Sequence, residues 1–181
     1  MRISGRTIFL DRAFAPQLNS TLRLGQLLVI RKGMLMNFLR IVLAALCGLV
    51  AYFAVGGLAF VLIPSLKSEF LKFPAVYRDH NGQMSHMPAG MAGIFLSILV
   101  LAVLFAQLCQ GEYGDGSGLA AGTRFGALIG VFVLGAFVLH NYANLNIGLK
   151  LTLEQGLAYF IEWTVVGVAI GLIYRPSTPH L

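Results

Sequence analysis

Long runs of apolar residues, separated by short polar stretches, dominate the pattern along this chain. A helix needs about 20 mostly apolar residues to cross the hydrocarbon core of a bilayer. Transmembrane strands do not fit, because they would read as alternating segments of roughly 10 residues. The pattern therefore predicts an all-α, integral membrane four-helix bundle with spans at about residues 41–63, 89–108, 119–139 and 156–174.

The polar stretches between these spans are connections, and only the one from Pro64 to Pro88 is long enough to be a substantial loop. The connection between the third and fourth spans, residues 141–148, is short, which makes these two spans antiparallel neighbours. The expected domains are a basic N-terminal segment, a membrane domain and a short tail, at residues 1–36, 37–176 and 177–181.

Composition and charge indicate where in the cell the protein is located. Apolar residues make up 57% of the chain and charged residues 11%, whereas about 25% of the residues of a soluble domain are charged. The net charge is +6, but the basic residues are not clustered on a soluble domain, so the expected partner is the lipid bilayer and not nucleic acid. With the N-terminus in the cytoplasm, nine of the 13 Lys and Arg residues lie inside, which is the positive-inside pattern. We therefore expect a multi-pass protein of the cell inner membrane with both termini cytoplasmic.

This topology depends on the N-terminal segment, residues 1–36. Met34 and Met36 stand just before the first span, so the segment is either a start-site artefact or an amphipathic stretch at the membrane surface. Without it, three basic residues lie inside against four outside, and the charge pattern no longer sets the orientation.

Glu162 is the candidate functional residue that stands out, because it lies within an otherwise apolar run, residues 157–174. An acid in the middle of a span costs at least about 2.5 kcal/mol. At about 1.5 Å per residue, Glu162 is about 18 Å from Tyr174, and Tyr52 is about 16 Å from Ile41. The two residues can therefore lie at one depth, and we expect the Tyr52 hydroxyl to be the partner of Glu162, with Ser97 as a third member.

Three roles for Glu162 are open at this point. It can be a neutral buried acid that fixes helix packing, since low dielectric favours the protonated form. It can couple proton or cation movement, or it can be a catalytic acid. Without a catalytic motif, we predict no enzymatic activity and no cofactor. The prediction is a multi-pass membrane protein without an assignable reaction, and the alternative is a small proton- or cation-coupled transporter that acts as an oligomer.

Glycines at a spacing of four residues predict close helix packing. Gly122, Gly126 and Gly130 form one row in the third span, and Gly167 and Gly171 form another in the fourth. Counted from the cytoplasmic ends, Gly122 lies level with Gly171, Gly126 with Gly167, and Gly130 with Trp163. We expect the two rows to face one another, although one row could instead serve a contact between two copies of the chain.

Several other polar residues carry weaker signals. His140 and Asn141 lie at the outward end of the third span and form either the mouth of a small cavity or an ordinary solvated helix end. His80, Met84 and His86 would suit a soft metal such as copper, but their spacing matches no strong metal motif and no metal site is predicted. The two cysteines, which form no C-x-x-C pair, are expected to be small buried apolar residues: Cys47 and Cys109.

From about Met36 to Pro176 the chain resembles a family of small four-span bacterial inner-membrane proteins of unknown function. The segments that carry this resemblance are Pro74–Arg78, Gly122–Gly126, Asn141–Asn146 and Glu162–Gly167. The resemblance implies the four-span fold and brings no activity with it. In size and in its membrane glutamate the chain also resembles small multidrug exporters, but here the glutamate is in the last span and not in the first.

Overall fold

The computed structural model describes residues 38–112 and 118–174, and both described parts are helical. Four of the helical segments are long and apolar enough to cross a membrane: Phe38–Leu62, His80–Leu108, Gly118–Asn144 and Leu149–Ile173. The predicted all-α four-helix membrane bundle is confirmed. The N-terminal segment, residues 1–36, and the tail, residues 177–181, lie outside the described residues.

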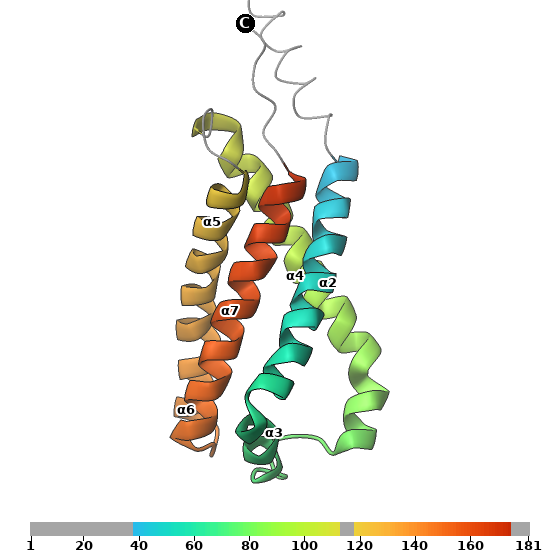
Figure 1. Cartoon of the computed structure of the whole chain (residues 1–181). Helices are drawn as coiled ribbons and strands as arrows, with labels where there is room; N and C mark the ends of the chain where they lie inside the picture. Colours follow the sequence, from blue (N-terminus) through green and yellow to red (C-terminus); the bar gives the residue numbers. More distant parts are fainter. Residues whose placement is uncertain (1–37, 113–117, 175–181) are drawn as a thin grey trace, which may run out of the picture. The chain divides into compact units, whose positions relative to one another are not determined.

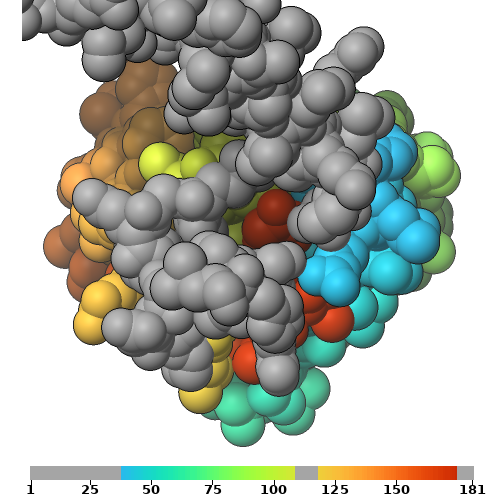
Figure 2. Space-filling model, turned by 90° about the horizontal axis from the view of Figure 1, so that it is seen from above, coloured from blue at the N-terminus to red at the C-terminus, as the bar shows by residue number. Residues whose placement is uncertain are grey.

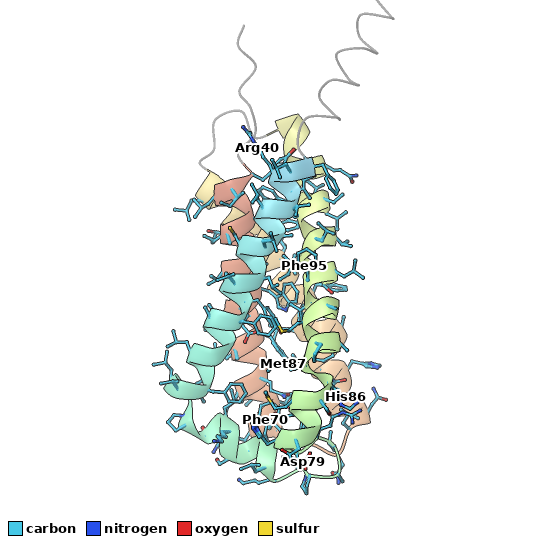
Figure 3. The ribbon with its side chains drawn as sticks, turned by 90° about the vertical axis from the view of Figure 1, so that its right-hand side faces the viewer. Arg40, Phe70, Asp79, His86, Met87 and Phe95 are labelled. Carbon is cyan, nitrogen blue, oxygen red and sulfur yellow. The ribbon has the colours of Figure 1, made fainter. Side chains whose placement is uncertain are left out.

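The spans are helices α2 (Phe38–Leu62), α4 (His80–Glu112), α5 (Gly118–Val133) and α7 (Leu149–Ile173). The third span continues beyond α5 through a π-helical turn, η1 (Leu134–Leu139), into α6 (His140–Asn144). Figure 1 shows α3 and α6 at one end of the bundle, and Figure 3 places Asp79 at that end and Arg40 at the other. We call these the α3 end and the Arg40 end.

The long connection after the first span is not the loop expected between Pro64 and Pro88. It contains helix α3 (Pro64–Leu71), which has its proline in the first helical turn, where the missing N–H is not needed. Helix α4 then begins at His80 and includes Pro88. Likewise, α7 begins at Leu149, seven residues before the predicted start of the fourth span.

Helix α7 is the central element of the bundle. Of its span residues, 44% are buried, against 17–22% in the other three spans. Its inward residues Val166 and Ile170 pack with Ala44 and Ala45 of α2, and with residues from the second half of α4, in one apolar core. Figure 2, seen from the Arg40 end, shows α2 in blue beside α7 in red. In contrast, residues 83–93 of α4 are exposed.

Helices α5 and α7 are held together by the two glycine rows, which face one another as expected. A methyl group built on Gly126 would lie 2.6 Å from the carbonyl oxygen of Thr164, and one on Gly171 would lie 2.7 Å from the Cα of Gly122. Backbone meets backbone along this contact, so neither row is available for a contact between two copies of the chain. The prediction that Gly130 lies at the same depth as Trp163 is wrong, because Gly130 packs against Phe160.

The outward surface of the spans is apolar. Val50 and Phe132 are typical, with 70% and 67% of their surface exposed, as expected where acyl chains take the place of water. Cys47 belongs to this surface, so the expectation that it is buried is wrong. The side chain of Cys109 lies outside the described residues.

Candidate functional site

Glu162 and Tyr52 meet in the middle of the bundle, where α7 faces α2. Glu162 is only 5% exposed, and the Tyr52 hydroxyl lies beside its carboxyl group. The structure thus contains the pair expected from their common depth. The Tyr52 ring packs against Trp163, with ring centroids 5.4 Å apart, which fixes the orientation of the hydroxyl.

The carboxyl group of Glu162 has one oxygen that is not satisfied. Oε2 is buried and has no hydrogen-bond partner among the described residues. Oε1 lies over Gly56 of α2, where an added methyl group would come within 2.9 Å of it. A glycine at this position therefore provides the space that the carboxyl group occupies.

Ser97 does not join this pair. Its hydroxyl donates to the carbonyl of Gly93 on its own helix, and its side chain is exposed. His140 and Asn141 are also separate, at the α3 end, where Asn144 donates a hydrogen bond to the His140 carbonyl. Of the predicted membrane-interior residues, the structure brings together only Tyr52 and Glu162.

A column of polar side chains continues from Glu162 toward the α3 end along one face of α7. It consists of Tyr159 and Gln155, one and two turns before Glu162. Tyr159 lies near both Glu162 and Tyr77. Gln155 donates a hydrogen bond of 3.1 Å to the Tyr77 hydroxyl. The residues of the column therefore connect α7 with the segment that follows α3.

An ionic cluster stands at the α3 end of this column. Glu69 of α3 is 2.7 Å from the ammonium of Lys72 and 3.1 Å from that of Lys150. Glu154 accepts a 2.6 Å hydrogen bond from Ser65 through Oε1. Its Oε2 is buried and, like that of Glu162, has no partner among the described residues. The cluster attaches α3 to the start of α7.

The ammonium groups act directly on Glu69. The hydrogen bond from Lys72, followed by that from Lys150, lowers the pKa of Glu69 below its ordinary value of 4.5. The unfolded chain therefore takes up a proton at a higher pH than the native carboxylate does. The stability that Glu69 contributes is present above the ordinary pKa and is lost as the pH falls through the native value.

We expect Glu69→Gln to make the thermal midpoint of the solubilised protein less sensitive to acid between about pH 6 and pH 3, because the group whose pKa differs between the two states is removed. Thermal unfolding followed by circular dichroism at a series of pH values measures this. Lys67→Gln is the control, since Lys67 is exposed on the same helix. Equal acid sensitivity of the wild type and Glu69→Gln would contradict the assignment.

Most of the column and the cluster could not be predicted from the sequence. Gln155, Tyr159 and Glu162 follow the spacing i, i+4, i+7 that marks one face of a helix. Gln155 stands just before the predicted start of the fourth span at Gly156, so it could not be recognised as part of this face. Glu69 and Tyr77 were missed because their segment was expected to be a loop.

The described residues contain no group of three or more His, Cys, Asp or Glu side chains that could hold a metal. His80 and His86 are six residues apart on α4, about 120° around the helix axis, so they do not converge with Met84 on one ion. The His86 ring nitrogen Nδ1 instead lies 2.9 Å from the Gly82 carbonyl.

One groove of about 420 Å³ lies on another face of α7, against η1. Its polar member is Thr152, whose hydroxyl donates to the Gly148 carbonyl and is therefore already satisfied. The lining is otherwise apolar: Leu134, Val138, Leu139, Leu153, Gly156, Leu157 and Phe160. The groove therefore offers no reactive group.

No family model matches the chain, and neither the curated proteins nor the solved structures include a significant match. The resemblances to the four-span bacterial family and to the small exporters therefore stay predictions. The chain is a four-span, all-helical protein of the multi-pass membrane class.

Proposed function

We propose that the chain is a proton-coupled membrane transporter subunit in which Glu162 binds and releases the coupled proton. The observation that carries this proposal is the state of Glu162: it is 95% buried at mid-span, the Tyr52 hydroxyl lies beside it, and its Oε2 has no hydrogen-bond partner among the described residues. An acid retained only for packing is expected to have both oxygens satisfied. An incompletely satisfied carboxyl group is suited to gaining and losing a proton.

A proton fits this site better than a metal cation. Metal ions such as Ca²⁺ need six or more oxygen ligands, whereas the groups around Glu162 are the Tyr52 hydroxyl, the Tyr159 side chain and apolar residues. Proton binding requires only the carboxylate. A catalytic acid would need a substrate-binding group beside it, so the site favours coupling over catalysis.

The proposed unit is an oligomer in a bacterial inner membrane, with both termini in the cytoplasm and the α3 end outside. The exposed half of α4 supports this association, because Gly90 and Gly93 have no neighbouring atoms where a methyl group would stand. Small residues at an exposed helix face allow close approach of another helix in a membrane.

A hydrophobic carbodiimide tests proton binding, since it reacts with protonated carboxyl groups within membranes. We expect dicyclohexylcarbodiimide to modify wild-type protein at Glu162, with labelling that falls at least tenfold from about pH 6 to pH 9 as the carboxyl group loses its proton. Peptide mass spectrometry locates the label. Glu162→Gln is the matched variant and should show no label on this peptide.

Two outcomes would overturn the proposal. One is the absence of Glu162 labelling over the whole pH range in native membranes. The other is labelling that does not change with pH, which would indicate an acid that stays protonated and serves packing alone.

A further inference from the structure

The surroundings of Glu162 differ sharply between the two directions along α7. Toward the Arg40 end, Val166 and Ile170 are 1% and 0% exposed. A methyl group built on Gly48 of α2 would lie 2.8 Å from the Ile98 side chain of α4. Apolar side chains from three helices therefore close this direction. In the described part of this core, the buried residues between Glu162 and the Arg40 end are apolar except for Trp163, next to Glu162, and Tyr174, at the far end.

Toward the α3 end, the same helix carries polar groups at each turn. Tyr159, Gln155 and Glu154 lie about 4.5, 10.5 and 12 Å from Glu162 along the helix axis. Tyr77 faces Gln155 from outside α7, where its hydroxyl accepts the hydrogen bond from Gln155, and it lies near Tyr159. The column thus links the mid-span carboxyl group to the edge of the span.

Glu154 has the properties of an entrance to this column. Lys150 is 3.1 Å from Glu69 but 3.9 Å from Glu154, so its ammonium is engaged mainly elsewhere. Ser65 satisfies Oε1 of Glu154, while the buried Oε2 has no partner among the described residues. A carboxylate oxygen without a partner, beside the aqueous end of the bundle, can accept a proton.

We infer that Glu154, Tyr77 and Tyr159 form a one-sided proton path that connects Glu162 with the aqueous phase at the α3 end. This inference rests on the proposed function. Glu154 takes a proton from water and passes it to the tyrosines. Each hydroxyl accepts one proton and gives up its own, so that one proton leaves Glu154, one arrives at Glu162, and both tyrosines are unchanged. Gln155 positions Tyr77.

The experiment is hydrogen–deuterium exchange at the Glu162 carboxyl group of the full-length protein in lipid vesicles. Infrared difference spectroscopy follows the protonated carboxyl band that is missing from Glu162→Gln. We expect Tyr159→Phe and Glu154→Gln to slow this exchange at least tenfold. Tyr142→Phe should exchange at the wild-type rate, since Tyr142 is an exposed tyrosine at the same end of the bundle.

Two path variants are used so that a folding defect in one of them does not decide the result. Glu154→Gln changes a residue about 12 Å from Glu162 along the helix axis, and circular dichroism checks that each variant is folded. Wild-type exchange rates in both path variants would overturn the path while Glu162 still titrates. A uniform slowing that includes Tyr142→Phe would overturn it as well. Failure of the proposed function looks different, because the wild-type band would then not respond to pH.

Discussion

Gly167→Ala is expected to separate α5 from α7 and to destabilise the bundle by about 3 kcal/mol, near the upper end of the usual cost of overpacking. The added methyl group would come within 2.5 Å of the backbone nitrogen of Gly126 and would also meet the Gly122 carbonyl. Both neighbours are backbone atoms of a packed helix, which cannot rotate away as a side chain can. The expected readout is a lower thermal midpoint, or loss of the folded protein, in detergent.

Gly57→Ala is the matched control for this prediction. Gly57 is also a helical glycine in a span, but no atom lies within 4 Å of the position that its methyl group would take. Alanine favours helix by about 1 kcal/mol over glycine, so this variant should be neutral or slightly stabilised. If Gly167→Ala also melts at or above the wild-type temperature, the close α5–α7 contact is not present in the protein.

The helix content and the facing glycine rows could be predicted from the sequence because both depend on local patterns. The length of an apolar run predicts a membrane span, and a glycine at every fourth residue predicts a helix face that packs closely against another helix. The position of α5 relative to α7 along the helix axes could not be predicted in the same way. Gly130 meets Phe160 and not Trp163, because side-chain packing decides the depth of each helix to within one turn.

The candidate site was predictable only where residues lie deep within the apolar runs. Tyr52 and Glu162 could be paired because their depths in the first and fourth spans match, and the structure places them side by side. Gln155 and Glu154 were not found, since polar residues at the edge of a span resemble a connection. Their partners, Tyr77 for Gln155 and Ser65 for Glu154, come from a distant part of the chain. A tertiary contact of that kind has no signature in a hydropathy pattern.

Gly56→Ala is expected to displace the Glu162 carboxyl group and to reduce carbodiimide labelling about tenfold, while the helices stay folded. The built methyl group lies 2.9 Å from Oε1 of Glu162, closer than the two groups can remain. Here the neighbour is the end of a flexible side chain, so the carboxyl group can rotate away at little cost to the fold. Its position beside the Tyr52 hydroxyl would be disturbed by that rotation. Labelling and thermal midpoint, measured on the same samples, separate these two effects.

Gly57→Ala is the control, because its methyl group would meet no atom within 4 Å although the two glycines are adjacent. Its labelling should equal that of the wild type. If both variants label normally, Glu162 does not depend on the space over Gly56, and the arrangement around the carboxyl group differs from the one described. If Gly56→Ala alone loses labelling and keeps its thermal midpoint, the glycine acts on proton binding and not on folding. The cost of a glycine in a helix is then explained by the acid that it accommodates.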